Sequence, residues 1–308
     1  MAKPIKDPLT GAETTGHVWD DTLQEFNNPL PRWWLWTFYA TMLFALAYFL
    51  IYPSWPIGST YTKGFSSVTY TGKGGKEMTT HWNTRALLAY DMQTGEQSLK
   101  QKEYLSKLAA TPYDQISQDP DMGAFVRSYG NGIFGDYCAA CHQAGGQGVV
   151  GLFPNLVDDA WLWGGSVEQI HQTVVNGRNG YMPPFRETFN DTQLNQVANY
   201  VLSLSDQPLD AEAAKQGELI FNGQAGGCYY CHTKEGTGLA SQGAANLTDK
   251  IWTVANVAGQ QTPEAKLAAI KAVISNGISR QMPSFAQRLD KTEIKVLVAY
   301  LKQMSSGN

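Results

Sequence analysis

CAACH at residues 138–142 and CYYCH at residues 228–232 decide the fold of this 308-residue chain, because they hold all four of its cysteines in two copies of one pattern, C-x-x-C-H. Two thiols that are separated by two residues on one helical turn can bond the two vinyl groups of a haem, and the adjacent imidazole then points at the iron. The pattern therefore predicts two covalently bound haem c groups. The thiols are those of Cys138, Cys141, Cys228 and Cys231, and the histidine ligands are His142 and His232.

A redox dithiol, a zinc site and a structural disulfide are the alternative uses of a C-x-x-C pair. A thioredoxin-like dithiol needs a βαβ context, which this sequence does not predict. A zinc site could use two such pairs, but zinc would not require a histidine directly after each pair. The repetition of the whole pattern in matching surroundings favours haem.

The second strong feature is an uncharged apolar segment, WWLWTFYATMLFALAYFLIY, at residues 33–52. At about 1.5 Å per residue it spans the roughly 30 Å hydrocarbon core of a bilayer. A cleavable signal peptide would instead have a shorter apolar stretch, a basic start and small residues before the cleavage point. Aromatic side chains mark both interfaces: Trp33, Trp34, Trp36, Tyr52 and Trp55. We therefore expect a transmembrane anchor at residues 33–55 that follows an N-terminal segment at residues 1–32.

Composition agrees with folded domains on a membrane anchor. Hydrophobic residues make up 43% of the chain and charged residues only 16%, against roughly 25% charged in typical soluble domains. The formal net charge of −4 offers no basic surface to nucleic acid, so no nucleic-acid partner is expected.

Residues 56–120, between the anchor and the first haem domain, are predicted to form a linker with helical segments. Residues 56–80 are rich in Gly, Ser, Thr and Tyr, which indicates irregular structure. Residues 82–110 contain good helix formers and spaced apolar side chains, which predict broken helices. The linker is expected to hold the haem domains at a fixed height and to carry no chemistry.

From about residue 121 the chain repeats itself. The segment NLVDDAW at residues 155–161 recurs as NLTDKIW at residues 246–252. Further matches are Asn176-Gly177 with Asn276-Gly277, Met182-Pro183 with Met282-Pro283, Phe185 with Phe285 and Tyr200 with Tyr300. The repeat predicts two tandem domains, at residues 121–207 and 208–308.

Each copy has an N-terminal helix, the C-x-x-C-H turn, a loop, a helix that ends before Met-Pro and a C-terminal helix. This order resembles the class I cytochrome c fold, in which a methionine after the middle helix reaches the iron opposite the histidine. The expected fold class is therefore mainly α, with one N-terminal transmembrane helix followed by two tandem class I cytochrome c domains. By this resemblance Met182 and Met282 are the sixth ligands, and a thioether suits electron transfer because it favours reduced iron. The alternative is that both are core methionines.

The same resemblance suggests residues around the haem. A proline carbonyl near Pro154 would accept the proximal imidazole N–H, and the second copy has Ala245 at that place. Arg178 and Arg186 could pair with haem propionates, although a surface role is the default for an arginine.

Several short motifs together resemble subunit III, the dihaem CcoP or FixP subunit, of cbb3-type cytochrome c oxidases. GHVWD at residues 16–20 and NPLPRWW at residues 28–34 are similar to that subunit's approach to its membrane span. FPNL at residues 153–156 and WLWGG at residues 161–165 are similar to its first haem domain. The NPLPRWW motif is the most specific of these, because few dihaem cytochromes carry it before a lone helix.

The resemblance implies electron relay and no catalytic centre in this chain. A periplasmic cytochrome c or another soluble donor would reduce the haems, which pass electrons to a monohaem cytochrome c subunit and then to a haem-copper catalytic subunit that reduces oxygen. The chain would cross the bacterial inner membrane once, with its N-terminus cytoplasmic and its haem domains periplasmic. The alternatives are a free-standing membrane-bound dihaem carrier and a dihaem peroxidase or thiosulfate-oxidising enzyme, in which one iron must be open to substrate.

Overall fold

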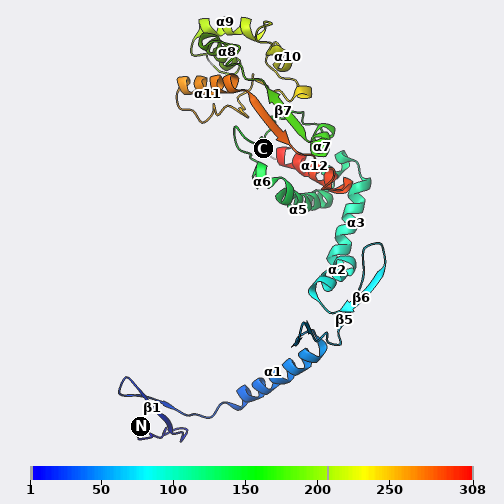
Figure 1. Cartoon of the computed structure of the whole chain (residues 1–308), viewed down its shortest axis with the longest axis vertical. Helices are drawn as coiled ribbons and strands as arrows, with labels where there is room; N and C mark the ends of the chain where they lie inside the picture. The colour runs from blue at the N-terminus through cyan, green and yellow to red at the C-terminus, as the bar shows by residue number, and fades with distance from the viewer. Residues whose placement is uncertain (1–2, 207, 307–308) are drawn as a thin grey trace. The chain divides into compact units, whose positions relative to one another are not determined.

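Helices form most of the regular secondary structure in the computed structural model, which describes residues 3–206 and 208–306, and this confirms the predicted fold class (Figure 1). The chain divides into two units, Met1–Gln101 and Lys102–Asn308. The elements of the first unit are β1 (Thr14–Trp19), β2 (Leu23–Phe26), α1 (Arg32–Ile51), β3 (Pro56–Ile57), β4 (Thr60–Tyr61), β5 (Ser67–Thr71), β6 (Glu77–His81) and α2 (Thr84–Thr94), and α3 (Glu96–Ala110) runs across the boundary.

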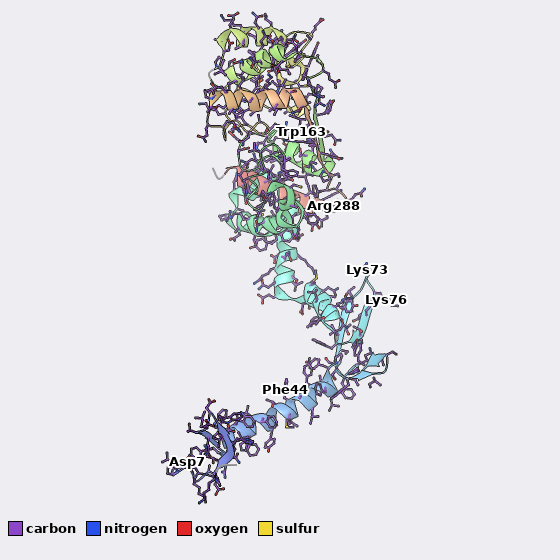
Figure 2. All side chains as sticks on the ribbon, turned by 60° about the vertical axis from the view of Figure 1, so that its left-hand side comes forward. Asp7, Phe44, Lys73, Lys76, Trp163 and Arg288 are labelled. Carbon is purple, nitrogen blue, oxygen red and sulfur yellow. The ribbon has the colours of Figure 1, made fainter. Side chains whose placement is uncertain are left out.

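Helix α1 is long and apolar enough to cross a membrane, and none of its side chains is buried. Figure 2 shows these side chains, Phe44 among them, projecting from the helix. The hydroxyls of Thr37 and Thr41 donate to the carbonyls of Trp33 and Phe38, at 2.9 and 2.7 Å, so these polar groups need no partner in lipid.

Helix α1 ends at Ile51, one residue before the end of the apolar run at residues 33–52. The last carbonyls of α1 find partners outside the helix: Phe65 N–H donates to Leu50 and Ser66 N–H donates to Ile51. The ring of Tyr52 packs edge-on against Trp82, with centroids 5.1 Å apart. These contacts end the helix where the chain turns away from it.

The prediction of irregular structure at residues 56–80 was wrong. Strands β3 and β4 form one antiparallel hairpin, and β5 and β6 form a second. Threonine and tyrosine favour strands, and the glycines that suggested a loop occupy the turns. The helices predicted within residues 82–110 are present as α2 and α3.

The second unit carries both C-x-x-C-H motifs. Its elements are α4 (Tyr113–Gln118), α5 (Pro120–Tyr137), α6 (Ala139–His142), α7 (Val167–Asn176), β7 (Arg178–Met182), α8 (Asp191–Ser203), α9 (Ala211–Phe221), α10 (Tyr229–His232), the 3₁₀ turn η1 (Ala240–Gln242), α11 (Pro263–Asn276), β8 (Ile278–Met282) and α12 (Lys291–Ser306).

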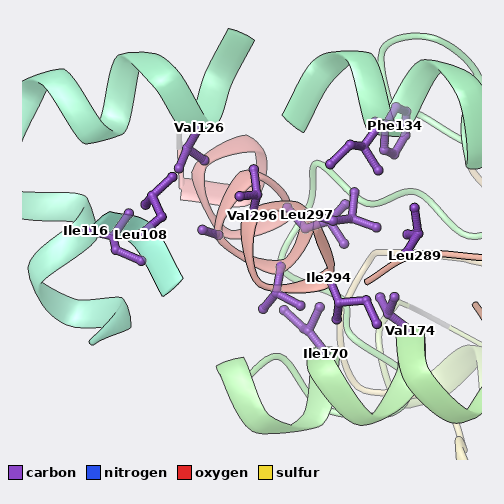
Figure 3. Packing of buried hydrophobic residues seen from close by; sticks show 14 of the residues in the cluster. Leu108, Ile116, Val126, Phe134, Ile170, Val174, Leu289, Ile294, Val296 and Leu297 are labelled. Atoms are coloured by element: carbon purple, nitrogen blue, oxygen red, sulfur yellow. The ribbon is translucent and has the colours of Figure 1, made fainter. Parts of the chain in front are cut away.

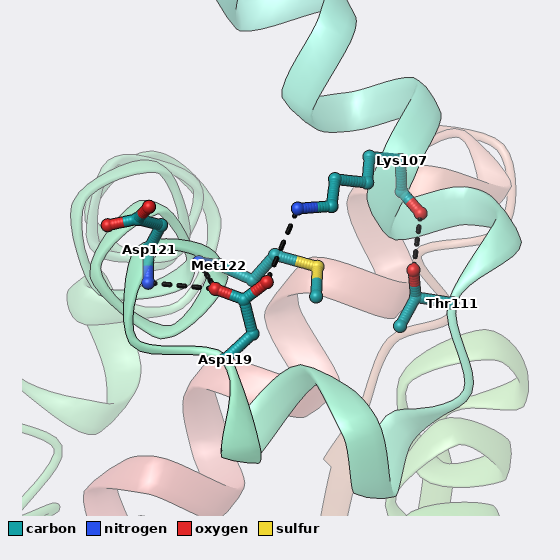
Figure 4. Close-up of polar contacts among 5 residues, drawn as sticks. All are labelled: Lys107, Thr111, Asp119, Asp121 and Met122. Carbon is teal, nitrogen blue, oxygen red and sulfur yellow. Dashed lines mark hydrogen bonds and ion pairs between the residues drawn. The ribbon is translucent and has the colours of Figure 1, made fainter.

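Asp119 stabilises the start of α5, the helix that precedes the first C-x-x-C-H motif (Figure 4). One of its carboxylate oxygens accepts from the backbone N–H groups of Asp121 and Met122, at 3.0 and 3.1 Å, and so caps α5. The other accepts from Lys107 in α3 at 3.3 Å. These hydrogen bonds and the lysine lower the pKa of Asp119, with the bond from Met122 as the largest cause. The cap therefore also joins α5 to the helix that leads into it.

Two hydrophobic cores lie in the second unit, and each combines helices from both sequence repeats. The first core packs α5 and α7 of the first repeat against α12 of the second (Figure 3). The second core packs α9 and α11 of the second repeat against α8 of the first. The two repeats have therefore exchanged their C-terminal helices, and the cores cross the boundary between residues 207 and 208 that the repeat suggests.

Contacts between glycine and tyrosine show the exchange at single residues. A β-carbon built at Gly130 in α5 would lie 2.6 Å from Cβ of Tyr300. A β-carbon built at Gly217 in α9 would lie 2.9 Å from Cβ of Tyr200. Because Tyr200 and Tyr300 are equivalent in the repeat, each occupies the place that the other would fill without exchange.

An antiparallel ribbon of β7 and β8 marks the crossing point. Its register runs from Arg178 opposite Met282 to Met182 opposite Ile278. Each strand leaves the middle helix of its own repeat and delivers the chain that follows to the other core. The ribbon thus carries both Met-Pro motifs.

Backbone hydrogen bonds hold each crossing segment in its new core. Phe285 N–H donates to the Val174 carbonyl near the end of α7, at 3.0 Å, and Phe185 N–H donates to Ile274 near the end of α11, at 3.1 Å. Gly177, at φ +71°, has the Met282 carbonyl so close that a β-carbon would lie 2.3 Å from its oxygen. Only glycine permits this crossing.

Replacing Leu297 in α12 by alanine should loosen α5, although the two segments are far apart in sequence. Leu297 is 1% exposed in the first core, so the cavity should lower the free energy of unfolding by about 2–5 kcal/mol. Hydrogen exchange read by mass spectrometry should show faster uptake in residues 120–137. The matched control is Leu202→Ala, also 1% exposed, which should accelerate exchange in residues 211–221. Faster exchange of residues 211–221 in Leu297→Ala would contradict the exchanged arrangement.

Candidate haem-binding sites

Both C-x-x-C-H motifs form single helical turns. The N–H of His142 donates to the Cys138 carbonyl and the N–H of His232 donates to the Cys228 carbonyl, each at 2.9 Å. All four thiols are free. Burial raises the pKa values of Cys138 and Cys228 to about 11, so both are neutral thiols at neutral pH. Cys138 lies against the first core and Cys228 against the second, so the two thiol pairs do not converge on a shared zinc site.

A backbone carbonyl orients each histidine. Nδ1 of His142 lies 2.9 Å from the Pro154 carbonyl, and Nδ1 of His232 lies 2.9 Å from the Ala245 carbonyl. A carbonyl can only accept, so Nδ1 carries the proton and Nε2 keeps its lone pair for a metal. The alanine in the second copy does not weaken this contact, because the acceptor belongs to the backbone.

Burial keeps both imidazoles neutral. It lowers the pKa values of His142 and His232, and the hydrogen bonds to Pro154 and Ala245 oppose the shift only in part. The neutral imidazole is the form that binds a metal ion. Both histidines are therefore held in the ligating tautomer and the ligating protonation state.

Two glycines that sequence reasoning missed make these contacts possible. Gly148 has φ +65°, and a β-carbon there would lie 2.4 Å from the Pro154 carbonyl oxygen that His142 uses. Gly238 has φ +75°, and a β-carbon there would lie 2.7 Å from the corresponding oxygen of Ala245. Both stand six positions after the motif histidine, at 142 and 232, and this shared spacing was a signal in the sequence that could have identified them.

Each candidate methionine ligand packs against the core that does not contain the C-x-x-C-H motif of its own repeat. Met282 packs against the first core, together with Cys138 and the loop residue Leu156. Met182 packs against the second core, together with Cys228 and Leu247. The exchange therefore brings each methionine to the core against which the first cysteine of the other repeat packs.

The donor set in each half fits a covalently attached haem. Each has a thiol pair on one helical turn, an imidazole with its Nε2 lone pair available and a thioether packed against the same core as the first thiol. Met304 in α12 also packs against the first core. Arg178 is half-buried beside Trp163, whereas Arg186 is exposed.

Fold and motifs together define a c-type cytochrome of two tandem domains behind a candidate membrane helix. Two family models match the chain. The N-terminal domain of cytochrome oxidase-cbb3, FixP, matches residues 11–59, and cytochrome c oxidase, cbb3-type, subunit III, matches residues 128–201 and 212–301.

Curated relatives extend over the full chain. The chain is 39% identical over 310 residues to the cbb3-type cytochrome c oxidase subunit FixP of Azorhizobium caulinodans, covering 98% of this chain and 96% of the relative. It is 35% identical over 320 residues to the subunit CcoP of Azospirillum brasilense, covering 100% of both. The chain belongs to the FixP/CcoP family of cbb3-type cytochrome c oxidase subunits.

Replacing Gly148 by alanine should disturb the first histidine site. The new methyl group would collide with the Pro154 carbonyl from a left-handed backbone conformation, so the free energy of unfolding should fall by about 1–3 kcal/mol. Gly132→Ala is the matched control, because a β-carbon there meets nothing within 4 Å inside α5 and should stabilise the protein by about 0.5–1 kcal/mol. Equilibrium denaturation in guanidinium chloride measures both changes. Equal stability of the two variants would show that the Pro154 carbonyl does not require glycine at position 148.

Proposed function

We propose that this chain is the dihaem electron-relay subunit of a cbb3-type oxidase. It carries two haem c groups and passes electrons from a periplasmic donor towards a haem-copper catalytic subunit. The observation that carries the proposal is the pair of preorganised histidine sites, His142 with Pro154 and His232 with Ala245, within one unit of a chain that belongs to this family. Residues 11–59 match the family's N-terminal domain, which favours an oxidase subunit over a free-standing carrier.

The exchanged fold supports a crossed set of axial ligands. The haem attached to Cys138 and Cys141 would take His142 and Met282, and the haem attached to Cys228 and Cys231 would take His232 and Met182. The support is that Met282 and Cys138 pack against one core, while Met182 and Cys228 pack against the other. Each methionine therefore serves the haem of the other repeat.

These ligands suit relay and not catalysis. Haem iron supplies the one-electron chemistry, and its His/Met ligation favours the reduced state. Met182 and Met282 would fill the position at which oxygen or peroxide would otherwise bind, so the proposal includes no catalytic centre in this chain. The carbonyls of Pro154 and Ala245 hold the imidazoles in place, which limits the movement that accompanies a change of iron charge.

The proposal includes a single membrane crossing by α1, with residues 1–32 in the cytoplasm and the unit with the haem motifs in the periplasm. Attachment of haem c on the outer side of the bacterial inner membrane supports this orientation. The partners proposed are a monohaem cytochrome c subunit and the haem-copper subunit, together with a periplasmic cytochrome c or another soluble donor.

Replacing each methionine by histidine should test the crossed ligands. Met282→His should lower the midpoint potential of the first haem, since an imidazole stabilises oxidised iron more than a thioether does. The first haem is identified as the one whose low-spin spectrum is lost in His142→Ala. Met182→His is the matched control and should instead lower the potential of the haem that His232→Ala disturbs. A shift on the same-repeat haem in either variant would rule out the crossing.

Purification through a C-terminal tag tests the proposed function itself. After extraction in a mild detergent, b-type haem, copper and reductant-driven oxygen uptake should accompany the tagged chain. A lone chain with two c-type haems under several gentle extractions would instead identify a free-standing carrier. The matched control is the same preparation from cells that carry the untagged chain.

A further inference from the structure

One face of the β7–β8 ribbon carries the two methionines and two arginines. Alternate residues face the protein and are half-buried, whereas the residues between them are exposed. The inward residues form three cross-strand pairs: Arg178 with Met282, Gly180 with Arg280, and Met182 with Ile278. Both guanidinium groups therefore start from the same surface as the proposed sulfur ligands.

Arg280 reaches a loop of the first repeat. Its guanidinium donates to the carbonyl of Gly151, in the loop that leads to Pro154 and so to the carbonyl partner of His142. Arg280 is half-buried, and in the described parts of the chain no carboxylate forms an ion pair with it. A half-buried cation without a counter-ion favours an anion nearby.

Arg178 is held by residues of the first repeat as well. Its Nε donates to Thr173 Oγ1 at 2.9 Å, and its Nη2 donates to the Gln169 carbonyl at 3.4 Å. The guanidinium stacks over the Trp163 ring, 4.8 Å from the centroid. All three partners belong to the first repeat, and in the described residues Arg178 also lacks a carboxylate partner. Its Nη1 makes none of these bonds and can still donate.

The second site has uncharged residues at the corresponding positions. The repeat aligns Arg178 with Ile278 and Arg280 with Gly180. A β-carbon built at Gly180 would meet no atom within 4 Å, so the ribbon is open beside Arg280. Arg186 lies at the second core, where its Nη1 donates to Asn276 Oδ1 at 3.4 Å, but its side chain is exposed. The two repeats therefore share the candidate haem ligands, whereas only the first site has an arginine at these two ribbon positions.

We propose that Arg178 and Arg280 bind the propionate carboxylates of the haem attached to Cys138 and Cys141, and that the second haem lacks these partners. Arginine presents several N–H donors that match the geometry of a carboxylate. Two fixed cations beside an iron centre favour the state with one more electron, so they raise the reduction potential of the first haem relative to the second. The inference rests on the proposed dihaem function.

Neutral substitution of Arg280 tests this assignment in the full-length haem-loaded protein. Arg280→Gln keeps a donor for the Gly151 carbonyl and removes the charge. Spectroelectrochemical titration should show a lower midpoint potential for the first haem and a smaller change for the second. Arg178→Gln should act in the same direction. An unchanged first-haem potential in both variants, or equal shifts of both haems, would overturn the proposal.

Three further variants separate charge from structure. Arg280→Lys keeps the cation and should retain most of the wild-type potential, whereas a purely structural role would not be rescued by charge. Arg186→Gln is the matched control and should leave the first-haem potential unchanged. Ile278→Arg adds a cation at the second site and should raise the potential of the second haem, and this test does not require an Arg280 variant to fold. A fall or no change there would count against the proposal.

The haem content and potentials of the wild-type protein and the variants distinguish failure of the proposed function from failure of the propionate assignment. Two low-spin haems in the wild-type protein are required by the proposed function, and their absence would defeat that function. Two intact haems whose potentials do not respond to Arg178, Arg280 or Ile278 substitutions would defeat only the propionate assignment.

Discussion

The pairing of β7 with β8 is the constraint on which the rest of the haem-bearing unit depends. Because the strands run antiparallel and each comes from a different repeat, the chain beyond each strand must enter the other core. A slip of one residue would turn Met182 and Met282 to the outer face, since side chains alternate along a strand. The register of one short ribbon therefore controls both the helix packing and the placement of both candidate thioether ligands.

Exchange makes the two halves mutually dependent. The first core needs α12, which ends the chain, and the second core needs α8, which precedes the second motif. Each proposed haem would have its thiols and histidine from one repeat and its methionine from the other. The β7–β8 pairing therefore connects the two halves directly.

The histidine side of each site is built locally and is nearly identical in the two repeats. A glycine six positions after the histidine lets a loop carbonyl approach Nδ1, and the acceptor distance is 2.9 Å in both copies, although one acceptor is proline and the other alanine. The repeats differ in charge on the ribbon, because the residues equivalent to Arg178 and Arg280 in the other repeat are Ile278 and Gly180. The two repeats thus share the geometry around the histidine and differ in the charge of the neighbouring ribbon residues.

The sequence alone determined the chemistry and the kinds of element. The C-x-x-C-H pairs, the apolar run of α1 and the Met-Pro repeats identified the haem-type motifs, the candidate anchor and the tandem cytochrome fold, because each depends on local spacing. Local patterns misjudged the hairpins at residues 56–81, since strand pairing overrides a loop-like composition. Only the tertiary structure decided which methionine shares a core with which motif. Tyr200 and Tyr300 are equivalent in the repeat, as are Gly130 and Gly217, so exchanged and unexchanged packing would pair the same kinds of residue, and a repeated sequence cannot distinguish the two arrangements.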